Sequence, residues 1–292
     1  MSEIVPRQLT KPAAVALLAI LGGILLLGAP GCASKGPHKP DAITQELLTQ
    51  PKEVLFEKGK ALIEKKKWDQ GRKYLNHVFE NYPNDQIGRE ALLMVADSYF
   101  KQKTTSSYTE ARYRYRDYLN RYPGAPRRDY ARYQFALCYD KEHESPDRDQ
   151  TATREAIDQY NTLIREFPDS GYAGAGRERI RQLTDLLAEH DFGVGYFYLR
   201  KGAAASALGR FTQLEQRYPN YTAKDKLYYY RGVALDRLGR KDEARQYLGK
   251  VLEEYPASDY AKKAKSKLGK APPAPEKPAT AAISVDSKPQ TQ

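Results

Sequence analysis

The sequence predicts an all-α fold, an α-solenoid in which five helical hairpins stack one after another. The first observation is a helix stop that recurs five times, an aromatic residue followed by proline. Proline ends a helix because it cannot donate the backbone hydrogen bond and clashes with the preceding turn. The second observation is that small and large residues recur at fixed distances before each of these prolines, which are Pro83, Pro123, Pro168, Pro219 and Pro256.

Three positions before each proline place the second helix of each hairpin. A small residue stands twelve residues before the proline, and large apolar or aromatic residues stand eight and five residues before it. Steps of four and three residues lie on one face of an α-helix. In chain order the three positions are Gly71, Leu75 and Val78; Ala111, Tyr115 and Tyr118; Ala156, Tyr160 and Leu163; Ala207, Phe211 and Leu214; and Ala244, Leu248 and Val251.

A second pattern upstream places the first helix of each hairpin: a small residue, then a large one three residues later. We expect the small residue to let the two helices approach closely, while the large residues fill the space between them. Since one hairpin cannot bury its own apolar face, the units must stack. The spacing and the terminal proline resemble the tetratricopeptide motif. The pairs are Gly59 and Leu62, Ala96 and Tyr99, Ala136 and Tyr139, Gly195 and Tyr198, and Gly232 and Leu235.

The array departs from a regular repeat in four places. The turn of the second copy, over Lys101–Tyr108, is expected to be three residues longer than the others, and the third copy has an eight-residue excess around His143–Asp149. The long interval between Pro168 and Gly195 predicts an extra long helix between repeats three and four, roughly Tyr172–His190. After the last proline we expect a charged capping helix, Asp259–Lys267.

The N-terminal segment has the pattern of a lipoprotein signal. An uncharged run, Ala13–Leu27, follows basic residues and ends in small residues before Cys32, as in a bacterial lipobox, although Ala29 stands where leucine is usual. The predicted organisation is a signal peptide (1–31), a lipid-anchored tether (32–45), the solenoid (46–270) and a disordered tail rich in proline and alanine (271–292). The alternative is a soluble secreted protein. With Cys32 acylated, Cys138 has no disulfide partner and is expected to be a small buried residue.

Nothing in the sequence predicts catalysis. The four histidines have no metal-ligand spacing, and we expect no metal, no cofactor and no enzyme activity. The net charge of +11 could attract nucleic acid, but exposed lysine and arginine account for it, so no nucleic-acid partner is expected. A solenoid instead offers a concave groove for an extended or helical peptide. Candidates for that substrate groove are Phe56, Lys60, Ile63 and Tyr133, with packing between repeats as the alternative.

One stretch is more specific than a generic repeat. SPDRDQTATREAIDQYNTLIREFPDS, followed by LAEHDFGVGYFYLRKGAAASALGRF, lies within Ser145–Pro219 and resembles the outer-membrane assembly lipoprotein family BamD. The resemblance implies a lipoprotein on the periplasmic face of the outer membrane, anchored through Cys32. It also implies binding to the POTRA domains of a β-barrel assembly protein through the C-terminal repeats, and recruitment of unfolded outer-membrane proteins by the N-terminal repeats.

The resemblance also implies partner-binding residues. Arg210 matches an arginine of the fourth repeat that contacts an acidic group on the POTRA partner, and Asp191 stands where the family more often has glutamate. A guanidinium presents a fork of donors that suits a carboxylate and that lysine cannot copy. The alternative function is that of another periplasmic tetratricopeptide-repeat lipoprotein, acting in envelope division or polysaccharide export.

Overall fold

The computed structural model describes residues 42–269, which form twelve helices and no strand. The expected signal peptide, Cys32, most of the tether and the tail from residue 271 lie outside the described residues. From Glu46 onward the helices belong to one compact unit. The helices are α1 (Ala42–Thr49), α2 (Lys52–Glu64), α3 (Trp68–Asn81), α4 (Gln86–Phe100), α5 (Thr105–Arg121), α6 (Arg128–Asp140), α7 (Thr151–Glu166), α8 (Gly171–Arg200), α9 (Ala204–Arg217), α10 (Lys224–Arg237), α11 (Lys241–Glu254) and α12 (Asp259–Leu268).

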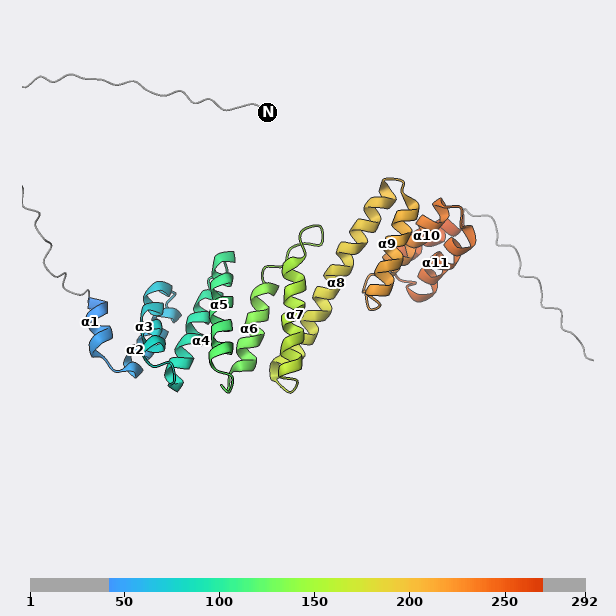
Figure 1. The fold of residues 1–292 in the computed structure, drawn as a ribbon. Coiled ribbons are helices and arrows are strands. Elements are labelled where there is room, and N and C mark those ends of the chain that lie inside the picture. The colour runs from blue at the N-terminus through green and yellow to red at the C-terminus, as the bar shows by residue number, and fades with distance from the viewer. Residues whose placement is uncertain (1–41, 270–292) are drawn as a thin grey trace, which may run out of the picture. The chain divides into compact units, whose positions relative to one another are not determined.

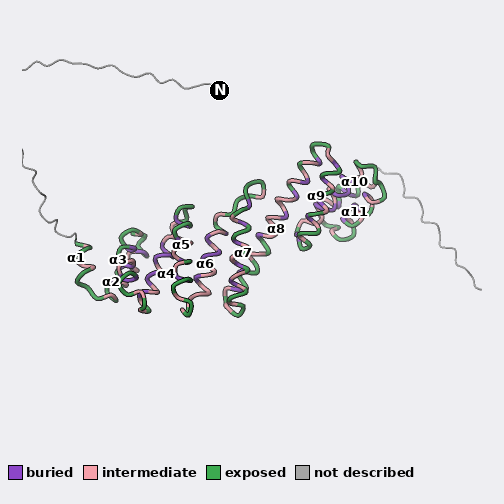
Figure 2. Tube along the Cα trace, in the orientation of Figure 1, coloured by how far each residue is buried: buried purple, intermediate pink, exposed green. Residues whose placement is uncertain are grey.

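The predicted solenoid of five hairpins is confirmed. The hairpins are α2 with α3, α4 with α5, α6 with α7, the second half of α8 with α9, and α10 with α11, and α12 packs on the last of them. Consecutive helices stand side by side in Figure 1. Figure 2 shows that the buried residues lie along the helices, whereas the turns between helices are mostly exposed.

The small residues of the repeat lie where the two helices of a hairpin touch. A Cβ atom added to Gly59 would lie 2.8 Å from Cγ of Leu75, and one added to Gly232 would lie 2.8 Å from Cγ of Leu248. Distances this short are not tolerated, so the large residue of the second helix fills the space that the glycine leaves. The predicted pairing of small and large residues is thereby confirmed in these hairpins.

Two irregularities differ from the expectation. The turn of the second hairpin, residues 101–104, is one residue longer than that of the first, residues 65–67, and not three; the added length lies mostly at the start of α5, whose 17 residues exceed the 14 of α3 by three. Thr104 and Ser107 form a reciprocal capping box that starts the helix at this point. The extra helix after Pro168 does not end near His190 but continues as one helix of 30 residues, Gly171–Arg200, into the fourth hairpin.

The other two irregularities lie where they were expected. The excess of the third copy forms the α6–α7 loop, residues 141–150, and a charged helix, α12, follows the last proline. Ser258 caps α12 by accepting a hydrogen bond from the Tyr260 amide at 3.0 Å, and Ala261 and Ala264 are buried against α11 and α10. α12 therefore closes the apolar end of the array.

Candidate partner-binding surface

Helix α8 belongs to two hydrophobic clusters at once. Leu183, in its first half, packs with buried residues of α6 and α7, whereas Ala188 and Phe192 pack with α9 and α10. In the second half, a Cβ atom on Gly195 would lie 2.6 Å from the Phe211 ring, so α9 is seated directly on that glycine. The first half of α8 thus packs against α7, and its second half packs against α9.

Because α8 is shared in this way, it continues past the start of α7 (Figure 1). His190 marks the crossing point, since its Nδ1 lies 2.6 Å from the carbonyl oxygen of Pro146 in the loop before α7. In a regular repeat, one side of the first helix would pack on the preceding hairpin. Beyond His190, α8 has no such hairpin to pack on among the described helices. The exposure of Phe197, 56%, reflects this.

A cavity of about 550 Å³ lies along this part of α8, and we call it the α8 groove. Its apolar surface comes from Pro146, Val194 and Phe197. Two carboxylates lie at its edge: Glu189, which accepts from Lys226 Nζ at 2.5 Å, and Asp147. The hydrogen bond from the Ser145 hydroxyl holds the pKa of Asp147 below its usual value. The complete lining is Pro146, Asp147, Glu189, His190, Gly193, Val194, Phe197 and Tyr198.

Arg210 lies on α9 beside the same segment of α8. Its Cβ is 3.3 Å from the position a Cβ would take on Gly195, the residue that follows Val194 of the groove. The side chain is exposed, and within residues 42–269 no carboxylate pairs with its guanidinium. The stem is therefore held against α8, while the charge is open to a partner.

Asp191 differs from Arg210 because its charge is already compensated. Arg217 Nη1 donates to Asp191 Oδ2 at 3.1 Å, and the Asp191 side chain is 29% exposed. This contact joins α8 to the end of α9. A partner that used Asp191 would have to share it with Arg217.

The four residues predicted for a substrate groove do not form one site. Phe56 and Lys60 are half-buried on α2, where Lys60 Nζ lies 3.8 Å from Glu57, and Tyr133 is on α6. Tyr133 stacks on Tyr172 with 5.1 Å between the ring centroids. Ile63 is only 4% exposed and packs against Gly71, so it belongs to the α2–α3 interface rather than to an open face. Ile63 therefore has the alternative role given above, packing inside the repeat array, and does not line an open groove.

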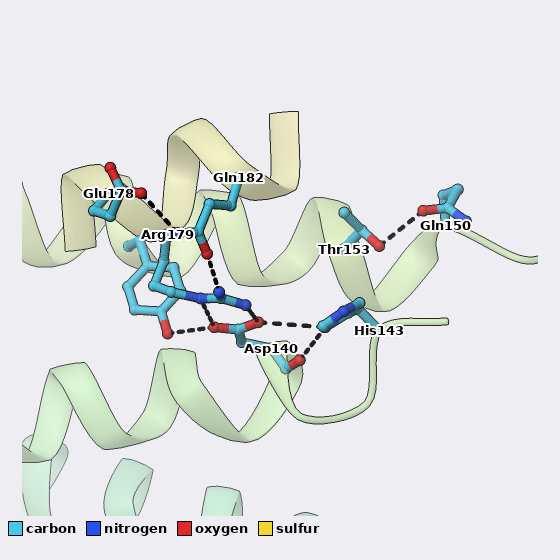
Figure 3. Close-up of polar contacts among 8 residues, drawn as sticks. Asp140, His143, Gln150, Thr153, Glu178, Arg179 and Gln182 are labelled. Carbon is cyan, nitrogen blue, oxygen red and sulfur yellow. Dashed lines mark hydrogen bonds and ion pairs between the residues drawn. The ribbon is translucent and has the colours of Figure 1, made fainter. Parts of the chain in front are cut away.

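A buried charge cluster joins α6, α7 and α8 (Figure 3). Asp140 at the end of α6 is 1% exposed and accepts from Arg179 of α8 at 2.6 and 2.7 Å and from the Tyr160 hydroxyl of α7 at 2.8 Å. Burial opposes ionisation of Asp140, but the bonds from Arg179 and Tyr160 outweigh it and lower its pKa. His143 adds a contact from the α6–α7 loop, with Nδ1 at 3.3 Å from Asp140.

Sequence reasoning missed both the α8 groove and this cluster. Asp140 and Arg179 are 39 residues apart, and a single sequence contains no signal that pairs them. The groove had one signal, the eight-residue excess before α7 together with the long helix after it, because both features change the neighbours of α8.

The described residues contain neither a candidate metal site nor a membrane-spanning helix. Between residues 42 and 269, no group of His, Cys, Asp and Glu could hold a metal ion, and no helix in this range is long and apolar enough to cross a membrane. Cys138 is a free, fully buried thiol, as predicted, and burial raises its pKa to about 12. A thiol in that state is unreactive at neutral pH.

Together, the five stacked hairpins and the long α8 define a helical-repeat protein of the solenoid class. The family described as "YfiO: Outer membrane lipoprotein" matches residues 49–248, and the chain belongs to this family. The match confirms the resemblance seen in the sequence.

Characterised relatives cover most of the chain. The outer membrane protein assembly factor BamD of Caulobacter vibrioides is 27% identical over 233 residues, 80% of this chain and 73% of the relative. That of Rickettsia prowazekii is 27% identical over 246 residues, 84% of this chain and 94% of the relative. Among solved structures, the TPR2AB-domain:pHSP90-complex of yeast Sti1 covers 74% of this chain at 17% identity, with a TM-score of 0.43.

Proposed function

We propose that this chain is a non-enzymatic lipoprotein scaffold for outer-membrane protein assembly. It is held on the periplasmic face of the outer membrane by acylated Cys32. The names of the relatives support this role over the alternatives in envelope division or polysaccharide export. Two observations carry the proposal, the α8 groove and the unpaired Arg210 on α9, since both lie in the stretch that resembles the family most specifically.

The groove and Arg210 suit a partner that presents both an apolar side chain and a carboxylate. In this proposal the partner is the POTRA region of the β-barrel assembly protein. Phe197 and Val194 would cover the apolar group, and the Arg210 guanidinium would bind the carboxylate in a forked geometry. Asp191 would contribute to the interface indirectly, by accepting a hydrogen bond from Arg217 at the end of α9.

Binding of the isolated POTRA domains to Arg210 variants tests this interface. Removing one partner of a desolvated interfacial charge pair costs about 2–5 kcal/mol, so Arg210→Leu should weaken affinity at least tenfold, and Arg210→Lys should restore it only in part. Arg177→Leu is the matched control, because Arg177 is also exposed and is on the first half of α8. Full affinity of Arg210→Leu would exclude this residue from the interface, and a collapsed melting curve would make it structural.

The apolar part of the interface needs a separate test. Phe197→Ala should reduce POTRA affinity without lowering the melting temperature, since the ring is mostly exposed in the free protein. Tyr113→Ala is the matched control, because Tyr113 is another exposed aromatic residue, 52% accessible, on α5. Equal loss of affinity in both variants would contradict a specific role for the groove.

Unfolded outer-membrane proteins are proposed to bind the N-terminal repeats at Phe56 and Lys60 on α2, with Tyr133 on α6 as a separate contact. A photo-crosslinking amino acid at each position should capture an unfolded β-barrel protein. The same amino acid at Ile63, which is buried, should not do so. Capture at Ile63 alone would show that the substrate does not bind at the proposed positions.

The class of function is tested by recovery of the full chain from detergent-solubilised membranes. Co-purification of a β-barrel assembly protein supports the proposal. Recovery of division or polysaccharide-export proteins without it would support the alternative.

A further inference from the structure

At one position of the hairpin turns, two repeats have lysine where two others have glycine, and backbone energetics does not explain the lysine. Seven residues after the small residue of the first helix, the chain adopts a left-handed conformation in four of the five hairpins. In the fourth and fifth hairpins this residue is glycine, Gly202 with φ 84° and Gly239 with φ 77°. In the first and second it is lysine, Lys66 with φ 59° and Lys103 with φ 58°.

Lysine is an unfavourable choice at this position. The left-handed region brings Cβ close to the following carbonyl oxygen, and glycine avoids the clash because it has no Cβ. The first hairpin also has the hydrogen bond that usually accompanies glycine there, from the Lys67 amide to the Leu62 carbonyl at 2.9 Å. A strained residue that recurs at the same turn position indicates that the side chain has a role.

The lysines of these two turns are exposed and carry uncompensated charge. Lys65, Lys66 and Lys67 form the first turn, and Lys101 and Lys103 flank the second. Within the described chain, none of the five makes an ion pair. Adjacent antiparallel hairpins place both turns at the same edge of the repeat array (Figure 1).

Cations near the opposite ends of these helices behave differently. Lys52 pairs with Asp85, Arg127 pairs with Glu90, and Arg121 donates to Asp117 at 2.6 Å. These three cations at the opposite ends are therefore paired, whereas the five lysines of the turn edge are not.

The chemistry of this edge suits phosphate groups on a lipid surface. All five cations are lysines, whose compact and strongly hydrated charge suits diffuse attraction, whereas arginine suits fixed forked contacts. Trp68, the one tryptophan of the chain, follows Lys67 and is half-buried, and tryptophan favours the boundary between membrane and water. Glu46 of α1 pairs with Lys58 of α2. From Thr49 back to Glu46, α1 therefore lies along α2 in the direction of the lysine turn.

We propose that Lys65, Lys66, Lys67, Lys101 and Lys103, with Trp68 beside them, form a docking edge for anionic phospholipid headgroups. The edge lays the N-terminal repeats on the membrane surface. This inference rests on the proposed membrane location, but it adds a second attachment that is independent of the lipid on Cys32.

The test uses the full chain, purified in mild detergent and incorporated into vesicles through its N-terminus. The vesicles contain either phosphatidylcholine alone or phosphatidylcholine mixed with anionic phosphatidylglycerol. Emission from Trp68 reports docking, because it shifts to shorter wavelength when the indole leaves water. We expect the shift only on the anionic vesicles and expect high salt to abolish it.

Variants separate the docking edge from overall charge. Each basic residue near an anionic surface contributes about a fivefold factor, so Lys65→Gln, Lys66→Gln and Lys67→Gln together should weaken docking roughly a hundredfold. The control replaces Lys262, Lys263 and Lys265 of α12 by glutamine, the same loss of charge, and should dock normally. Lys66→Gly with Lys103→Gly should weaken docking while the melting temperature stays the same or rises.

The outcomes distinguish this inference from the proposed location. A chain that fails to incorporate into either vesicle would contradict the lipid anchor. Incorporation with the same Trp68 emission on both vesicles would overturn the docking edge alone. Equal losses in the control variant, or an equal shift caused by soluble polyglutamate, would also overturn it, because the lysines would then be responding to any polyanion.

Discussion

Two joints between successive repeats are built around an aspartate, and they differ in one donor. Asp97 accepts from the Tyr115 hydroxyl of its own hairpin at 2.6 Å and from the Tyr130 hydroxyl of the next helix at 2.8 Å. Asp140 likewise accepts from Tyr160 of its own hairpin, but from Arg179 of the next helix. Tyr115 and Tyr160 occupy the same repeat position, eight residues before the proline.

The exchange of a phenol for a guanidinium reverses the shift of the carboxyl pKa. At Asp97, burial raises the pKa and the two phenols do not overcome it. At Asp140, burial acts in the same direction, but Arg179 and Tyr160 overcome it and the pKa falls. Ionisation is therefore disfavoured at the joint between the two ordinary hairpins and favoured at the joint that holds α8.

The largest difference between the joints should appear on replacing each aspartate. Asp140→Asn leaves Arg179 without its counter-charge and should lower the free energy of unfolding by about 3 kcal/mol. Asp97→Asn keeps an acceptor for both phenols and should change it by less than about 1 kcal/mol. Chemical denaturation measures both.

A double variant provides the control for this comparison. Asp140→Asn combined with Arg179→Met removes the unpaired charge and should recover part of the loss. Equal costs at Asp97 and Asp140, or no recovery in the double variant, would show that the charge at the second joint is not what distinguishes it.

Close packing on α8 should give the next largest effect. Gly195→Ala places a methyl group against Phe211 and should cost about 1–3 kcal/mol by overpacking. Gly193→Ala is two residues away on the same helix, meets nothing within 4 Å, and should gain about 0.5–1 kcal/mol. Thermal melts decide, and a stabilised Gly195→Ala would mean that α9 is seated elsewhere on α8.

The pH dependence of stability should differ in sign between the joints. Because the folded-state pKa of Asp140 is lowered, its contribution is present above the ordinary aspartate pKa and is lost as pH falls through the lowered value. The folded-state pKa of Asp97 is raised, so its contribution is present at low pH and is lost as pH rises. Denaturation across acidic pH should show a flatter acid limb for Asp140→Asn and a steeper one for Asp97→Asn.

The smallest effect concerns the hairpin turns rather than the joints. Lys66→Gly relieves the left-handed lysine and, after allowing for the greater freedom of glycine in the unfolded chain, should stabilise by about 0.5 kcal/mol. Lys65→Gly is the matched control, since Lys65 has φ −78° and should gain nothing. A destabilised Lys66→Gly would indicate that the lysine makes a structural contact.

The repeat itself was predictable, whereas its joints were not. Offsets such as Gly59 to Leu75 are local and helical, so periodicity revealed the hairpins before any contact was known. The continuation of α8 past His190 depends on which hairpin it packs against, and these tertiary contacts cannot be seen in the local periodicity. Arg210 was found through resemblance alone; periodicity gave no sign that its charge would be left unpaired.

The length of α8 has a mechanical consequence. Its 30 residues span about 45 Å, and it is clamped to α6 and α7 near Arg179 while the fourth hairpin is attached near its other end. The part of α8 beyond the clamp is about 32 Å long, so a rotation of about 6° at the clamp moves its far end by roughly 3 Å. A force applied to the C-terminal repeats by a bound partner would therefore load the contacts that hold α8 on α6 and α7, the bonds of Asp140 to Arg179 among them.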